Sequence, residues 1–144
     1  QELQNFMINT VSNFDVAQES FYHGLILGMS ATFCNYYELS SNRESGYGRY
    51  DIMLKPLDCN NPGIIIELKA VRQTNSVAAD KNSVLNQLQS MADEAIHQID
   101  SKEYYTSLKM YGCKSIIKYG IAFSGKLCRA NVERWNNTNL QSPN

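Results

Sequence analysis

The sequence predicts a mixed α/β domain built around a central β-sheet. Three observations support this fold class: an isoleucine-rich strand pattern in GIIIELK (63–69), an amphipathic helix pattern over about 83–99, and short alternating segments on both sides of that helix. The predicted order is a helix, three strands, further helices and two strands, without an internal repeat. A chain of 144 residues suits one such domain with a well-developed core.

The first half of the chain predicts a helix and a three-stranded meander. Asp15 and Gln18 form an N-cap with a capping-box partner, and an apolar stripe at helical spacing follows. That stripe consists of Phe21, Tyr22, Leu25, Ile26 and Met29. Alternating segments then predict strands at 36–40, 49–55 and 63–69, separated by a polar, glycine-bearing turn at 41–48 and a turn at 57–62.

The second half predicts two helices followed by two closing strands. The helix over 83–99 has a wide apolar face formed by Val84, Leu85, Leu88, Met91, Ala92, Ala95, Ile96 and Ile99. A shorter helix with Tyr104, Tyr105 and Leu108 is expected to end at Gly112. Segments 115–123 and 126–132 predict strands joined at Ser124-Gly125, and the polar tail from Asn136 is expected to fray.

Composition excludes several classes of protein. The net charge of −1 argues against a general polyanion binder, so any contact with nucleic acid should be local. No apolar run has the length of a membrane span. Four cysteines without metal-site spacing favour reduced thiols in an intracellular protein over a disulfide framework. Because the first residue is Gln1 rather than Met, we expect a piece of a larger protein.

The charged end of GIIIELK predicts a functional face. Side chains alternate along a strand, so Glu67 and Lys69 share one face with Ile65. A short turn makes an antiparallel hairpin with the preceding strand the default, and a register with Lys55 opposite Gly63 places Asp51 opposite Glu67. Facing carboxylates destabilise a hairpin unless a cation lies between them, and Mg²⁺ binds through one or two carboxylates.

This acid–acid–lysine face suits phosphodiester hydrolysis. Lys69 could hold or deprotonate the attacking water, or neutralise a phosphate, while a divalent cation stabilises charge at the attacked phosphorus. The alternative is structural, because an acid and a lysine two residues apart are common on a solvated strand edge. The preceding Asp51 on a matching face strengthens the catalytic interpretation without deciding between the two, and the wider set of motifs changes the balance.

A wider set of motifs resembles the PD-(D/E)XK nuclease superfamily. The stretches are FYHG (21–24), SNRESGYGRYDI (41–52), IIELK (65–69), AIHQ (95–98) and YGIAFSGK (119–126). They are similar to one branch, the nuclease-like domain found C-terminal to an AAA-ATPase-like module in bacterial proteins, and related domains occur in effector toxins of intracellular bacteria. The resemblance runs from about Asp15 to about Val132, and the 41–52 run is its most specific part.

The resemblance implies a restriction-endonuclease-like core, a mixed central β-sheet flanked by α-helices. It divides the chain into an N-terminal extension at 1–14, a nuclease domain at 15–135 and a polar tail at 136–144. The implied activity is Mg²⁺-dependent hydrolysis of nucleic acid, with DNA favoured over RNA, RNA left open, and Mn²⁺ able to substitute for Mg²⁺. The implied location is the cytoplasm, or a host cell if the protein is a delivered effector; the oligomeric state is left open.

The family's site residues fall on particular positions of this chain. Its two metal-binding acids correspond to Asp51 and Glu67, and its catalytic lysine to Lys69. Glu19 lies where many members add a helix glutamate, and its alternative is a surface pair with His23 at i,i+4 spacing. Gln98 matches a helix glutamine that assists the site in some relatives, or it is an exposed amide. The family's usual proline before the first acid is Tyr50 here.

Other residues are candidates for substrate contact. Arg43, Arg49 and His23 could bind the substrate, the two arginines by clamping a phosphate, although Arg43 could instead pair with Glu44. Tyr22 and Tyr47 could stack on bases, or they belong to the core.

Two functions therefore follow from the sequence. The first is an active metal-dependent nuclease, which the presence of Asp51, Glu67 and Lys69 together favours. The second is a catalytically silent nuclease-fold module that binds protein or nucleic acid within a larger effector or ATPase protein. Divalent-metal binding distinguishes the two.

Overall fold

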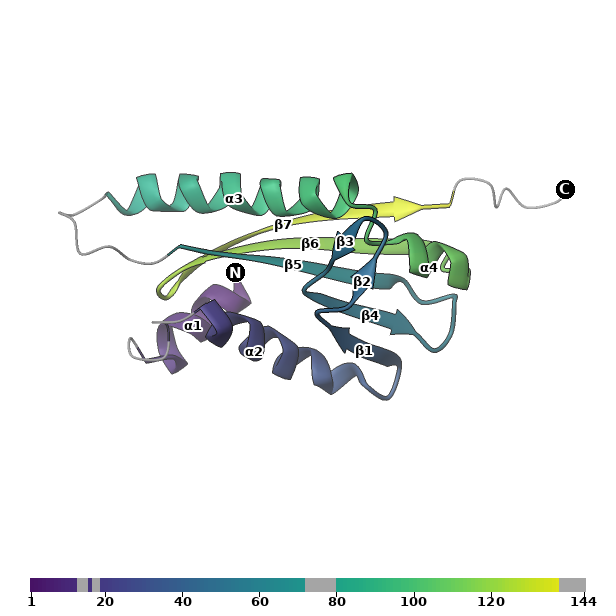
Figure 1. Cartoon of the computed structure of the whole chain (residues 1–144). Coiled ribbons are helices and arrows are strands. Elements are labelled where there is room, and N and C mark those ends of the chain that lie inside the picture. The colour runs from purple at the N-terminus through teal and green to yellow at the C-terminus, as the bar shows by residue number, and fades with distance from the viewer. Residues whose placement is uncertain (13–15, 17–18, 72–79, 138–144) are drawn as a thin grey trace, which may run out of the picture.

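The computed structural model describes residues 1–12, 16, 19–71 and 80–137, without the side chain of Glu19. The predicted cap at Asp15 and Gln18 lies outside this part of the chain, as does the tail beyond residue 137. The architecture is a mixed sheet with helices on both faces (Figure 1). The predicted fold class is thus confirmed.

The central sheet has five strands in the order β1-β4-β5-β6-β7. Strands β1, β4 and β5 form an antiparallel meander, β5 and β6 run parallel, and β7 returns antiparallel to β6. The bounds are Tyr37–Ser41 for β1, Ile52–Pro56 for β4, Gly63–Val71 for β5, Ser115–Ser124 for β6 and Leu127–Asn136 for β7. The parallel pair requires a crossover, and the segment between β5 and β6 contains helices α3 and α4.

Helices cover the two faces of the sheet (Figure 1). Helices α1 (Glu2–Thr10) and α2 (Glu19–Ser30) lie on one face, and a short 3₁₀ turn, Ala31–Phe33, leads from α2 to β1. Helices α3 (Lys81–Ser101) and α4 (Thr106–Tyr111) lie on the other. The alternation within β4 and β5 assigns the faces, since Ile52, Leu54 and Ile66 pack with α2 while Met53 and Ile65 pack with α3.

Two local predictions are confirmed at the level of backbone geometry. The β4–β5 hairpin pairs Met53 with Ile65 and Leu54 with Ile64, which is the predicted register. Helix α4 ends at Gly112, whose φ of 99° is the left-handed conformation that glycine adopts without strain. The hairpin register matters for function because it determines which residues lie beside Glu67.

The segment predicted as a turn at 41–48 instead carries a small second sheet. Strands β2 (Glu44–Ser45) and β3 (Gly48–Arg49) form a hairpin, and Arg49 therefore belongs to β3 rather than to the strand that begins at Ile52. Gly46 makes this possible with a φ of 60°. We call residues 43–50 the recognition hairpin.

The predicted N-terminal extension, 1–14, includes helix α1, which packs on the sheet. Met7 is fully buried there. The Gln4 side chain donates to the carbonyl of Lys126 at 2.8 Å and accepts from the N–H of Cys128 at 2.7 Å. These bonds join α1 to the β6–β7 turn and the start of β7.

Two further findings concern the class of protein. All four cysteines are free, as predicted. Within the described residues, no helix combines the length and hydropathy that crossing a membrane requires.

Candidate active site

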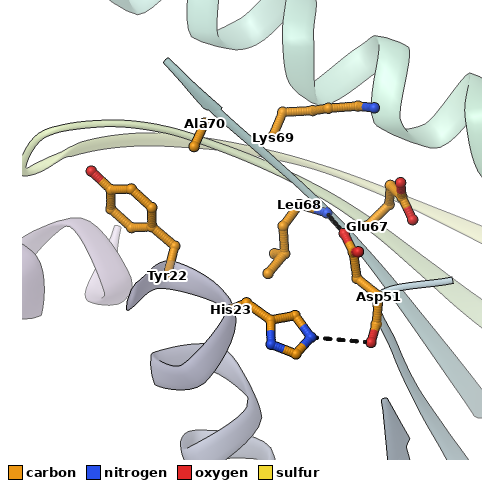
Figure 2. A pocket seen from close by; sticks show the side chains of 7 residues that line it. All are labelled: Tyr22, His23, Asp51, Glu67, Leu68, Lys69 and Ala70. Carbon is orange, nitrogen blue, oxygen red and sulfur yellow. Dashed lines mark hydrogen bonds between the residues drawn. The ribbon is translucent and has the colours of Figure 1, made fainter. Parts of the chain in front are cut away.

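Three of the predicted site residues, Asp51, Glu67 and Lys69, meet where strand β4 begins and the neighbouring strand β5 continues past it. A cavity of about 210 Å³ lies there, lined by residues of α2, by Asp51 and by the part of β5 beyond it (Figure 2). Its lining consists of Tyr22, His23, Asp51, Glu67, Leu68, Lys69 and Ala70. Asp51, Glu67 and Lys69 were predicted to share a site, and they line the same cavity.

Asp51 is held against β5 by a backbone hydrogen bond. It directly precedes β4, and the register that pairs Ile52 with Ile66 places it beside Glu67. Its Oδ2 accepts from the N–H of Leu68 at 2.8 Å (Figure 2). This bond fixes one carboxylate oxygen at β5, and Asp51 lines the cavity.

Glu67 is a buried carboxylate that lacks part of its hydrogen bonding. Only 4% of the residue is exposed. Burial, and secondly the charge of Asp51, raise the pKa of Glu67 to about 8, with Lys69 opposing the rise. Among the side chains that the structure describes, its Oε2 is the single buried oxygen or nitrogen without a hydrogen-bond partner. Such a group is costly in a core and typical of a place where a ligand binds.

The burial of Glu67 depends on the neighbouring strand. Gly120 of β6 is its register partner, and a Cβ at Gly120 would lie 2.1 Å from the carbonyl oxygen of Ala92. Helix α3 therefore approaches the sheet closely only because this residue has no side chain. The close approach covers Glu67 and brings the next turns of α3 over β5.

Gln98 of α3 links the two charged residues of β5. Its amide Nε2 donates to Oε1 of Glu67, and its Oε1 accepts from Nζ of Lys69. The amide thus presents its donor to the acid and its acceptor to the base. Gln98 is half-buried and bonded to both residues, so it is not an exposed surface amide, and its part in the activity stays a prediction.

His23 reaches the site from α2 on the opposite face of the sheet. Its Nε2 lies 3.4 Å from the carbonyl oxygen of Asp51, 3.3 Å from Oγ of Ser41 and 3.4 Å from Nδ2 of Asn42 (Figure 2). These contacts place the imidazole at the cavity wall beside the backbone of Asp51. Sequence reasoning did not identify Ser41 or Asn42 as its neighbours.

The remaining candidates lie around this centre. Glu19 is the first residue of α2, one turn before His23, and its predicted roles stay predictions because its side chain lies outside the description. Arg43 and Arg49 are exposed on the recognition hairpin. Arg49 faces Glu44 across that hairpin, and among the described residues no ion pair joins Arg43 to Glu44.

The two tyrosines considered for base stacking differ in exposure. Tyr22 is 3% exposed, stacks on Phe123 with ring centroids 4.5 Å apart, and donates its hydroxyl to the carbonyl of Gly125 at 3.0 Å. It belongs to the core, and the stacking interpretation of Tyr22 is wrong. Tyr47 is 75% exposed at the tip of the recognition hairpin and is accessible to a base.

The residues at the cavity fit a hard divalent cation. Asp51 and Glu67 supply two carboxylates, and Oε2 of Glu67 is buried without a hydrogen-bond partner. In the described part of the chain no three His, Cys, Asp or Glu side chains cluster as a metal site. Two carboxylates are nevertheless the usual protein contribution to Mg²⁺, whose other ligands are water and phosphate oxygens.

Tyr104 is a site neighbour that the sequence did not reveal. Gln98 Nε2 donates to its hydroxyl at 3.2 Å, and the residue is 2% exposed. The sequence pattern indicated only that Tyr104 is an apolar residue of a short helix. The backbone N–H of Leu68 was equally invisible, since no sequence pattern assigns a backbone donor to a particular carboxylate.

Comparison with known proteins supplies the family. The family model for the PD-(D/E)XK nuclease superfamily matches residues 17–133. The chain therefore belongs to that superfamily, as the motifs predicted. No curated protein matches it.

One solved structure, titled "Crystal structure of SSO0001", is similar at 15% identity with a TM-score of 0.31. The similarity covers 81% of this chain and 52% of that one, so this chain spans about half of its length. At that score the likeness has no bearing on fold or function.

Proposed function

We propose that this member of the PD-(D/E)XK nuclease superfamily is a Mg²⁺-dependent nuclease that hydrolyses phosphodiester bonds, with DNA as its substrate. The observation that supports this most directly is the unpartnered Oε2 of Glu67, buried beside Asp51 at an open cavity. A purely structural carboxylate in a core is satisfied by donors or by a salt bridge. A site for a cation accounts for both the missing partner and the second acid.

Asp51 and Glu67 would hold the metal, together with Glu19 if its carboxylate reaches the cavity. When bound, a divalent cation lowers the pKa of water and stabilises negative charge on the attacked phosphate. Oδ1 of Asp51 and Oε2 of Glu67 are the oxygens left for it, because Leu68 N–H and Gln98 Nε2 occupy the others. Each acid is thereby oriented by a bond on its far oxygen.

Lys69 would supply the cation that acts on the substrate. Its Nζ donates to Oε1 of Gln98, which orients the ammonium group at the cavity. From there it can orient the attacking water, accept its proton after releasing its own, or stabilise charge that develops on the phosphate. Gln98 contributes by holding Glu67 and Lys69 in one geometry.

The substrate would approach along the side of the recognition hairpin. Arg43 and Arg49 are exposed there, and their guanidinium groups suit phosphate oxygens. This local contact agrees with the near-neutral net charge, which offers no extended basic face. DNA, rather than RNA, is proposed from the family resemblance.

The test combines metal binding with cleavage. Calorimetry should show Mn²⁺ binding to the wild type and none to Asp51→Asn, with both proteins folded by circular dichroism. Asp58→Asn is the matched control. Asp58 is an exposed acid of the β4–β5 loop, and its Oδ1 accepts a hydrogen bond from the N–H of Asn60. Plasmid, linear and single-stranded DNA, with RNA in parallel, should be cut in Mg²⁺ and protected by EDTA.

The outcomes distinguish the two functions derived from the sequence. Unchanged Mn²⁺ binding in Asp51→Asn would refute the metal site, and cleavage that persists in EDTA would refute the metal-dependent mechanism. A wild type that binds Mn²⁺ and cuts nothing would identify a binding module with a nuclease fold. From the resemblance alone we also propose a bacterial source, a neighbouring ATPase-like module, and a cytoplasmic location or delivery into a host cell. The choice of DNA as substrate rests on the same resemblance.

A further inference from the structure

The recognition hairpin is fastened to the turn between α3 and α4. The N–H of Tyr47 donates to the carbonyl of Lys102 at 2.8 Å, and Oγ of Ser45 donates to the carbonyl of Tyr104 at 2.7 Å. A Cβ at Gly46 would lie 2.3 Å from the Lys102 oxygen, so the two backbones meet without an intervening side chain. These contacts hold the hairpin on the α3–α4 turn, which we call its seat.

Tyr104 lies between that seat and the carboxylates. A Cβ at Gly48 would lie 3.2 Å from its ring, and the ring of Tyr50 meets it edge-on with centroids 6.5 Å apart. On the other side, its hydroxyl accepts the hydrogen bond from Nε2 of Gln98 at 3.2 Å. One buried residue thus contacts the hairpin through its backbone and ring, and the site through its hydroxyl.

The hydrogen bonds continue from Gln98 to both charged residues of β5. The same amide nitrogen donates to Glu67, and the amide oxygen accepts from Lys69. The position of this amide consequently sets the positions of the acid and the base. The Tyr104 hydroxyl holds the second hydrogen of the amide nitrogen, which restricts rotation of the amide.

The hairpin also joins the site at its other end. Its stem is closed by the N–H of Asn42, which donates to the carbonyl of Asp51 at 3.0 Å, and by the N–H of Tyr50, which donates to the carbonyl of Arg43 at 3.2 Å. Tyr47 at its tip is 75% exposed, Arg49 two residues later is exposed, and Arg43 is exposed at the stem. An aromatic ring beside guanidinium groups is the chemistry that binds a nucleic-acid strand.

We propose that Tyr104 is a positioning residue that couples nucleic acid bound at the recognition hairpin to the geometry of Gln98, Glu67 and Lys69. A nucleic-acid strand bound by Tyr47 and the arginines presses the recognition hairpin against the α3–α4 turn. Tyr104 belongs to that turn, so the position of its hydroxyl, and with it the Gln98 amide, changes with the hairpin. The inference rests on the proposed nuclease function, because it assigns the regulation of that same site.

The first test is kinetic. Tyr104→Phe keeps the ring that Gly48 and Tyr50 contact and removes the hydroxyl. We expect kcat to fall roughly three- to tenfold, the scale of one neutral hydrogen bond, with KM unchanged. The control is Tyr105→Phe, whose ring packs under Lys109 away from the site and which should cleave as the wild type does. An unchanged kcat in Tyr104→Phe, or a fall entirely in KM, would overturn the proposal.

The second test does not require cleavage. The side-chain NH₂ signal of Gln98 is followed by ¹⁵N NMR while a DNA oligonucleotide is added in EDTA. In the wild type this signal should shift together with the backbone signals of 44–49, and in Tyr104→Phe only the hairpin signals should shift, with the same Kd. An equal Gln98 shift in both proteins, or none in the wild type, would refute the coupling.

The two proposals can fail separately. If the wild type cuts nothing in Mg²⁺ or Mn²⁺ but its Gln98 signal follows the oligonucleotide in a Tyr104-dependent manner, the coupling stands and the nuclease function fails. If the wild type cleaves and the Gln98 signal does not shift when the oligonucleotide is added, the nuclease function stands and the coupling fails.

Discussion

Two buried ionisable side chains lie on neighbouring strands under the same helix, and their surroundings differ. Lys118 of β6 is 6% exposed, and its Nζ donates to Asp100 at 2.9 and 2.7 Å and to Glu133 at 2.8 Å. Glu67 of β5 is 4% exposed, yet its Oε2 has no partner. Lys118 is paired with Ile65 in the register, two residues before Glu67, so both charges face α3.

The pKa values of the two groups reflect this difference. Burial lowers the pKa of Lys118, but its bonds to Asp100 and Glu133 together outweigh burial and raise the pKa, so the charged form is favoured. Burial raises the pKa of Glu67 to about 8, so the charged form is disfavoured. A buried charge with a complete set of partners supports the fold, and one without them marks a place for a ligand.

The largest effect is expected at Lys69, which separates catalysis from binding. Lys69→Ala should reduce cleavage in Mg²⁺ by roughly two to four orders of magnitude, the scale of losing a general base or an electrostatic stabiliser. Its affinity for Mn²⁺ should stay equal or rise, because a cation beside the carboxylates is removed. Arginine at this position should not restore full activity, since guanidinium stays protonated. Equal cleavage by wild type and Lys69→Ala would indicate a contaminating nuclease.

The second effect concerns the stability of the metal-free protein against pH. Because the folded pKa of Glu67 lies above that of an unfolded glutamate, its contribution is present below about pH 4.5 and is lost as pH rises to about 8. Each pKa unit corresponds to about 1.4 kcal/mol, so the loss is a few kcal/mol at most.

Glu67→Gln should flatten this slope between pH 5 and pH 8 in urea unfolding measured in EDTA. Lys118→Met is the comparison, since its slope in that range should match the wild type. If the free energy of unfolding of the wild type is constant between pH 5 and pH 8, the pKa of Glu67 is not raised in the folded protein.

The third effect is the structural role of Lys118. Lys118→Met keeps an apolar stem but leaves Asp100 and Glu133 beside each other without a cation. We expect a loss of about 2 kcal/mol, below the 3–5 kcal/mol typical of a broken buried pair, because the two carboxylate side chains are 42% and 49% exposed. Adding Asp100→Asn and Glu133→Gln should recover most of it. Failure of the triple variant to recover stability would mean that packing, rather than charge, is lost.

The smallest effect is stabilisation by metal. Mn²⁺ at ten times its Kd should stabilise the wild type and Lys118→Met equally, by about 1.4 kcal/mol. Asp51→Asn should show no stabilisation. The affinity of the wild type should rise with pH up to about 8, because Glu67 must lose its proton to bind the cation. Thermal unfolding with and without Mn²⁺ at pH 6, 7 and 8 measures both effects.

Much of the fold and of the site follows from local patterns. Side-chain alternation in GIIIELK and the short turn before it were sufficient to predict the β4–β5 register, and with it the meeting of Asp51 and Glu67. The helical stripe over 83–99 predicted α3, and its resemblance to family motifs predicted Gln98. The register and the helix could be predicted because strand and helix periodicity determine which side chains share a face, before any long-range contact forms. The role of Gln98 stays a prediction from the resemblance.

The energetic state of the site is a product of the tertiary structure. Glu67 is buried because Gly120, more than fifty positions along the chain, lets α3 lie close to the sheet. Gln98 from that helix bonds its Oε1, and its Oε2 is left without a partner. The seating of the recognition hairpin on the α3–α4 turn likewise joins backbones far apart in sequence. Sequence periodicity specifies faces, whereas burial, orphaned atoms and hydrogen-bond chains depend on which elements meet across those faces.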